Sequence, residues 1–127
     1  MKSNLMYMEL KSGFNPNGPA MIGKVKLSKA RKTIYFNGKA FSRSGGQGIL
    51  GNYYDIETSE EYWISGAKKN EENRWKKNNI KTYIDQTIID EYLNLIEKET
   101  IDLSKYELVK IIDTDIQKFN SLCNQPL

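Results

Sequence analysis

The segment KTIYFNGKAFS, residues 32–42, decides the class of fold that this chain adopts. β-Branched and aromatic residues, which favour strands, stand on both sides of the dipeptide Asn37-Gly38. Asn-Gly is the pair preferred in a two-residue type I′ turn, and that turn joins two antiparallel strands. The segment therefore predicts a β-hairpin.

More strand-like segments flank this hairpin, and each is bounded by residues that favour turns. They lie at residues 7–11, 20–28, 52–57 and 61–67. Gly23 interrupts the second of them, and we expect it to form a bulge. The polar stretch 66–79 is expected to be a loop or the tip of a long hairpin.

The hydrophobic period changes in the second half of the chain. Apolar residues at spacings of one, three and four predict a helix over residues 85–97, with Asp85 as its N-cap. The residues expected on its buried face are Ile84, Ile88, Ile89, Tyr92, Leu93 and Ile96.

The last part of the chain predicts two further elements. Residues 106–112 have the composition of a strand. Thr114 and Gln117 have the spacing of a capping box, which predicts a short helix over residues 113–123.

Together these elements predict a mainly β fold of the β-rich α+β type. With 127 residues, the chain is long enough for one compact domain. We expect a small curved antiparallel sheet, or a partly open SH3-like barrel, of five or six strands closed by the helix at 85–97. Residues 1–97 would form this domain, and residues 98–127 a C-terminal extension packed on it.

The composition argues against most catalytic chemistry. The chain contains no histidine and one cysteine, Cys123, so it lacks the usual base near neutral pH and the usual zinc ligands. We expect a non-enzymatic protein without metal or cofactor. No apolar run approaches the ~20 residues that cross a bilayer, and the first residues do not resemble a signal peptide. A cytoplasmic protein without membrane contact is expected, with no expectation about oligomeric state.

A glycine-rich stretch follows the hairpin and includes the spacing G-x-G-x-x-G. Its glycines are Gly45, Gly46, Gly48 and Gly51. In dinucleotide-binding folds the third glycine opens a helix, whereas here it precedes a strand-like segment. The stretch is therefore interpreted as a loop between strands.

Several motifs resemble a family of small bacterial proteins of unassigned function. The motifs are Asn-Gly-Pro at 17–19, Tyr-Phe-Asn-Gly at 35–38 and Tyr-Trp-Ile-Ser-Gly at 62–66, and the resemblance covers about residues 7–97. Members of that family sometimes carry the name deoxyxylulose-phosphate synthase. A synthase of that kind resembles the transketolases, with a Gly-Asp-Gly motif and active-site histidines, and this sequence has neither. The name is therefore rejected. Members of the family often have a histidine immediately before the tryptophan that matches Trp75, and this chain has Arg74 at that position.

The candidate binding surface combines aromatic and basic residues, and residues 1–78 carry 14 Lys and Arg against 7 Asp and Glu. Its members are Tyr54, Trp63, Lys68, Lys69, Arg74, Trp75, Lys76 and Lys77. Strand alternation requires one residue of each adjacent pair, Tyr53/Tyr54 and Tyr62/Trp63, to face the core.

Three functions fit these residues. Bases of single-stranded nucleic acid stack on such rings while cations meet phosphates, and this partner is slightly preferred. The alternative is a protein-binding module of the immunity, anti-defence or regulatory type, because Trp, Tyr and Arg dominate protein interfaces. The second alternative is a carboxylate-based enzyme acting on a small ligand, with acidic candidates Asp55, Glu57, Glu60 and Glu61 around one turn.

Overall fold

The computed structural model describes residues 4–11, 18–28, 32–43, 52–73 and 80–123. These residues form one mainly β sheet with two short helices. The strands are β1 (Leu5–Leu10), β2 (Ala20–Lys24), β3 (Lys26–Leu27), β4 (Thr33–Phe36), β5 (Lys39–Arg43), β6 (Tyr53–Asp55), β7 (Glu61–Gly66), β8 (Thr82–Asp85) and β9 (Tyr106–Val109). The helices are η1 (Gln86–Ile88), a single 3₁₀ turn that leads into α1 (Ile89–Ile96), and α2 (Ile116–Cys123).

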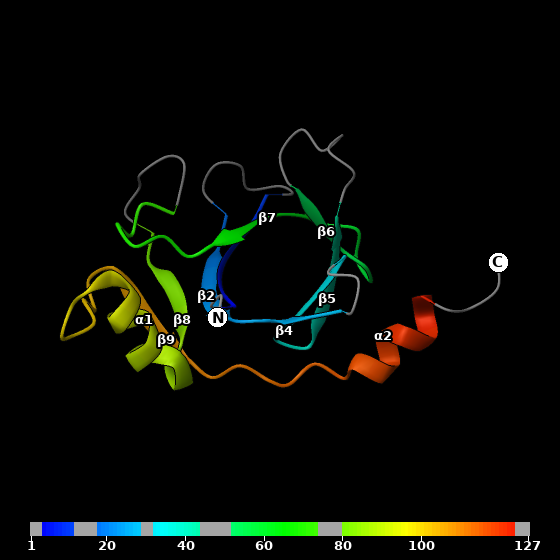
Figure 1. Ribbon diagram of the computed structural model, residues 1–127. Helices are drawn as coiled ribbons and strands as arrows, with labels where there is room; N and C mark the ends of the chain where they lie inside the picture. The colour runs from blue at the N-terminus through cyan, green and yellow to red at the C-terminus, as the bar shows by residue number, and fades with distance from the viewer. Residues whose placement is uncertain (1–3, 12–17, 29–31, 44–51, 74–79, 124–127) are drawn as a thin grey trace.

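The sheet curls into a half-barrel because the continuous segment β2–β3 pairs with β1 through β2 and with β4 through β3. The strand order is β3-β4-β5-β6-β7-β1-β2-β8-β9. Only Val25 separates β2 from β3, yet β2 pairs with β1 and β3 pairs with β4. This short connection brings β2 and β3, which stand at the two ends of the order β3-β4-β5-β6-β7-β1-β2, together around a common interior (Figure 1).

The central hairpin is confirmed. Strands β4 and β5 pair antiparallel, from Thr33 opposite Ser42 to Phe36 opposite Lys39. Asn37 and Gly38 have φ angles of 51° and 76°, and two consecutive positive φ values define the predicted type I′ turn.

The expected number and arrangement of strands are wrong in three respects. The structure has nine strands, more than the five or six expected. One predicted strand, residues 20–28, is divided at Val25 into β2 and β3. Strand β8 was not predicted and lies directly before the predicted helix. Strand β8 runs parallel to both of its neighbours, so the sheet is not purely antiparallel. Gly23 forms no bulge, since the β1–β2 register continues through it without a break.

The inner face of the curled sheet holds one apolar cluster. Its buried members are Met8, Val25, Ile34, Phe36, Phe41 and Ile64. The ring of Phe36 lies against the backbone of Gly23, where an added Cβ would be 2.3 Å from Cε1 of that ring. Gly23 is thus needed for a close approach between side chain and strand rather than for a bulge.

Helix α1 covers the outer face of the sheet and does not close the barrel, which corrects the expected closing role. Its Tyr92 and Ile96 pack with Leu5, Ile22 and Ile84 from three neighbouring strands. Those residues alternate with the inward-facing ones along β1, β2 and β8. Figure 1 shows α1 outside the ring of strands, beside β8 and β9.

The predicted start of this helical region is confirmed. The Asp85 carboxylate accepts a hydrogen bond from the backbone N–H of Thr87 at 2.9 Å. Glu97 ends the helix in the left-handed conformation, with φ 59°. The buried apolar face predicted from residue spacing includes Ile88, Tyr92 and Ile96, all of which are buried.

The C-terminal segment crosses beneath the half-barrel from β9 to α2 (Figure 1). Phe119 of α2 is buried against Tyr35 and Ala40 on the outer face of the hairpin. Thr114 does not cap α2 as expected, because its hydroxyl accepts a hydrogen bond from the N–H of Gly38 at 2.9 Å. Tertiary contact with the hairpin turn thus replaces the predicted local cap.

Candidate functional site

Tyr54 and Trp63 form an exposed aromatic pair, here called the outer pair, on the outer face of β6 and β7. They are 37% and 41% exposed. Tyr54 lies opposite Glu61, two residues before Trp63, so the two rings are diagonal neighbours within reach of one ligand group. Tyr53 and Tyr62 instead pack against the inner cluster. This confirms that one residue of each adjacent aromatic pair faces the core.

Strand β1 supports the outer pair with a buried, charge-balanced group. Glu9 lies directly opposite Trp63 and is 1% exposed. Its carboxylate accepts hydrogen bonds from the Tyr7 hydroxyl and the Lys11 ammonium, both at 2.7 Å. The ammonium of Lys11 is thereby held by a carboxylate inside the protein instead of facing a ligand beside Trp63.

Lys68 and Lys69 lie in the loop after β7, away from the outer pair. Strand β7 continues three residues beyond Trp63, which places the start of this loop about 10 Å further along the strand. Lys69 forms an ion pair of 3.0 Å with Glu97 at the end of α1. The backbone N–H of Lys68 donates to the side chain of Asn73, 2.7 Å away. Both predicted lysines line the same surface hollow as Ile96 and Glu97 at the end of α1.

A polar network holds this loop against α1 and β9. The Glu71 carboxylate accepts a hydrogen bond of 2.8 Å from the Tyr106 hydroxyl and forms an ion pair with Lys98. The Tyr106 and Tyr92 hydroxyls are 2.6 Å apart. Burial alone would raise the pKa of Glu71, but the hydrogen bonds from Lys98 and Tyr106 lower it overall. Glu71 is therefore ionised and acts as an anchor of the loop.

The eight remaining predicted site residues fall outside the described residues. They are Arg74, Trp75, Lys76 and Lys77 and, within the glycine-rich stretch, Gly45, Gly46, Gly48 and Gly51. The outer pair, Lys68 and Lys69 are thus the predicted site residues that the structure places.

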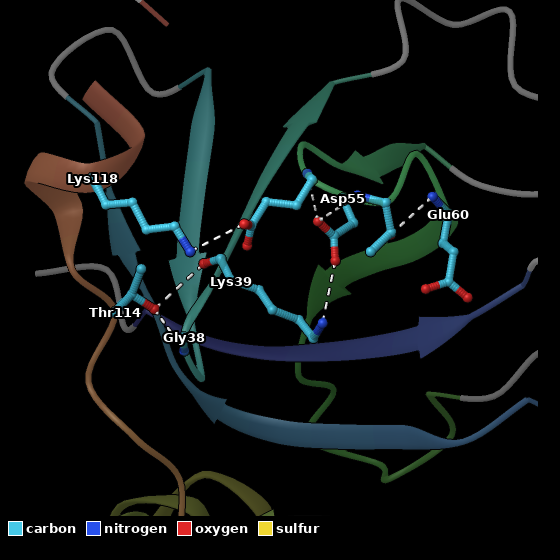
Figure 2. Close-up of polar contacts among 8 residues, drawn as sticks. Gly38, Lys39, Asp55, Glu60, Thr114 and Lys118 are labelled. Atoms are coloured by element: carbon cyan, nitrogen blue, oxygen red, sulfur yellow. Dashed lines mark hydrogen bonds and ion pairs between the residues drawn. The ribbon is translucent and has the colours of Figure 1, made fainter. Parts of the chain in front are cut away.

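The acidic cluster considered for catalysis is built around a turn (Figure 2). Asp55 is 1% exposed, and its Oδ1 accepts the backbone N–H groups of Glu57 and Thr58 at 2.9 and 3.3 Å. Its Oδ2 lies 3.3 Å from the ammonium of Lys39. Glu57 in turn pairs with Lys118 of α2 at 3.0 Å. These contacts give both carboxylates structural partners.

A cavity that the sequence analysis missed opens inside this end of the half-barrel. It has a volume of about 200 Å³, and its walls include Met8, Met21, Phe36, Phe41, Tyr62 and Tyr83. Lys39 lies at its rim. Strand alternation from Phe41 indicated that Lys39 faces inward, but the space between β2 and β4 depends on the bend at Val25, which no local signal revealed.

Tyr62 is the cavity residue with a clearly perturbed titration. Burial, followed by the nearby charges of Glu60 and Asp55, raises its pKa to about 12. Its ring packs edge-to-face on Phe41, with centroids 4.8 Å apart. Tyr62 is therefore a neutral hydroxyl at physiological pH, able to donate or accept a hydrogen bond.

Comparison of the chain with protein-family models, curated proteins and solved structures found no match. Among the described residues, no group of three or more acidic, cysteine or histidine side chains is arranged to hold a metal ion. In the same residues, no helix has the length and apolarity needed to span a bilayer.

Proposed function

We propose that the protein is a non-enzymatic binding module that docks a partner protein on the outer pair, Tyr54 and Trp63. The observation that carries this proposal is the position of two exposed rings as diagonal neighbours on adjacent strands. Tyr and Trp supply large contact areas and lose little conformational freedom when a partner covers them, which is why they dominate interface hot spots. The pairing of β7 with β6 on one side and with β1 on the other holds the strands that carry the rings.

The ion pairs of the described lysines favour a protein over a nucleic acid. The preference for nucleic acid rested on the net positive charge of residues 1–78. In the described residues, Lys11, Lys39 and Lys69 each pair with a carboxylate. The cross-strand neighbour of Tyr54 is an acidic residue, Glu61. A protein partner requires no row of unpaired cations around the rings.

The shape of the sheet suits a protein that presents a binding surface on a strand face. We propose that the curled sheet with its bent β2–β3 segment is a scaffold of the SH3-like kind, and that the chain belongs to the small bacterial family whose motifs it resembles. Such a scaffold presents rigid strand faces, and the outer pair lies on one of them.

Nucleic acid is the second candidate, favoured by the sequence of the loop after Asn73. That loop carries Arg74, Lys76 and Lys77 beside Trp75, a combination suited to phosphates and stacked bases.

The experiment is affinity capture with the full chain, with and without nuclease. The variants are Tyr54→Ala and Trp63→Ala, and the matched control is Leu103→Ala, which removes a 58% exposed apolar side chain elsewhere. The wild type and the Leu103→Ala control should capture one protein at moderate salt, and nuclease should not reduce the amount captured. Neither Tyr54→Ala nor Trp63→Ala should capture that protein. Loss of binding of about 2 kcal/mol for Trp63→Ala is expected of a hot spot.

Other outcomes decide against the proposal. Nuclease-sensitive capture that weakens steeply with salt identifies nucleic acid as the partner. Equal capture by wild type and both ring variants shows that the outer pair is not the docking site.

A further inference from the structure

The cavity inside the half-barrel is a second candidate site, on the opposite side of the sheet from the outer pair. Tyr62 faces the cavity and its neighbour Trp63 faces outward. Because successive residues of a strand point to opposite faces, a ligand in the cavity and a protein on the outer pair would not compete. This site is therefore independent of the function proposed above.

The size of the cavity suits an occupant of about one ring. An apolar protein cavity of ~150 Å³ accommodates benzene, and this cavity has about 200 Å³. A ring with a short substituent, roughly eight or nine heavy atoms, fits that space by the same scaling.

The walls favour an aromatic occupant. Phe41 and Tyr62 already form an edge-to-face pair, an arrangement that a third ring can extend. Met8 and Met21 line the same space, and the flexible, polarisable thioether adapts to aromatic edges. Phe36 closes the wall, held against Gly23 of β2.

The rim favours an uncharged ligand with one hydrogen-bond acceptor. The Lys39 ammonium has three N–H donors, and one faces Asp55 at 3.3 Å. The side chain of Lys39 is 41% exposed, whereas that of Asp55 is 1% exposed. The two charges balance each other, so neither an anion nor a cation gains a net attraction. A donor of Lys39 nevertheless remains available for a neutral oxygen.

We propose that this cavity binds a small uncharged aromatic molecule that carries one oxygen acceptor, of the class of aryl ketones and aryl alcohols. The ring lies among Phe36, Phe41 and Tyr62, and the oxygen accepts a hydrogen bond from the Lys39 ammonium. The site provides binding and no covalent step.

The test titrates the full chain, labelled with ¹³C at its methionine methyl groups, with acetophenone. The signals of Met8 and Met21 should shift, while that of Met6, which does not line the cavity, should stay in place. Benzoate and benzylamine, charged analogues of similar size, should bind at least tenfold more weakly, because burying an uncompensated charge is unfavourable.

Two variants locate the ligand. Lys39→Met should weaken acetophenone about tenfold, the effect of one hydrogen bond to a charged group, and leave toluene, which lacks the acceptor, unchanged. Met21→Trp should fill the cavity and abolish the binding of both acetophenone and toluene. Leu103→Ala, the control, should leave the binding of both unchanged. If Met21→Trp fails to fold, the Lys39→Met comparison decides alone.

The proposal is overturned if Met8 and Met21 do not respond, or if Met6 shifts as much as they do. It is also overturned if benzoate or benzylamine binds as tightly as acetophenone, or if Lys39→Met weakens acetophenone and toluene equally.

Discussion

Gly23→Ala should destabilise the protein through a clash with one identified ring. The added Cβ would lie 2.3 and 2.4 Å from two atoms of the Phe36 ring, far inside van der Waals contact. Phe36 is itself buried in the inner cluster, so the ring moves only by disturbing its neighbours. Overpacking of this kind costs ~1 to 3 kcal/mol.

The chain offers a matched control at the same level of the sheet. Met6 pairs with Gly23 on one side and with Gly66 on the other, and a Cβ at Gly66 meets no atom within 4 Å. Gly66→Ala should therefore be neutral or stabilising by up to ~1 kcal/mol, since alanine reduces the freedom of the unfolded chain.

The assay is urea unfolding followed by tryptophan fluorescence, with the double variant Gly23→Ala/Phe36→Leu included. The smaller leucine relieves the clash, so the two changes should be non-additive by at least ~0.5 kcal/mol. The reasoning is refuted if Gly23→Ala is as stable as Gly66→Ala. Strict additivity of the double variant would also refute it, because the cost would then not come from Phe36.

Three further predictions concern ionisable groups. The pKa of Tyr62 is about 12 in the folded protein and about 10 in the unfolded chain. The stability of the fold should therefore fall between pH 10 and 12. Thermal melts across this range should show a smaller fall for Tyr62→Phe. The pKa of Glu71 is lower in the folded protein than its ordinary value of 4.5. Its ionised form therefore contributes to stability above pH 4.5, and this contribution is lost as the pH falls through the folded pKa. In the same melts, Glu71→Gln should lose less stability on acidification than the wild type does. Glu9→Gln should cost ~3 to 5 kcal/mol in urea unfolding by leaving Lys11 buried without its counter-charge. The triple variant Tyr7→Phe/Glu9→Leu/Lys11→Met, which also removes the hydroxyl that donates to Glu9, should cost much less. Equal losses in both variants would contradict this.

Features with local causes were predictable from the sequence. The type I′ turn needs only Asn37 and Gly38 with strand formers beside them, and the helix start needs only Asp85 before an apolar period. The alternation that exposes Tyr54 and Trp63 is equally local, since it follows from the pleat of each strand.

Features that depend on distant partners were not predictable. Thr114 has the spacing of a capping residue, but its partner is the N–H of Gly38, 76 residues away. The role of Gly23 depends on the ring of Phe36, and the pairing of Lys69 depends on Glu97. No pattern within a single segment encodes these choices.

The curl of the sheet also bears on self-association. Exposed strand edges are templates for pairing with other chains, and the strand order here ends in β3 and β9. Strand β3 has two residues and continues β2, so it offers almost no edge. Strand β9 has four residues and lies between Lys105 and Lys110, and short edges flanked by lysine resist strand addition. In the part of the chain that the structure describes, the sheet thus offers little edge for strand addition, whereas its faces offer the larger surfaces.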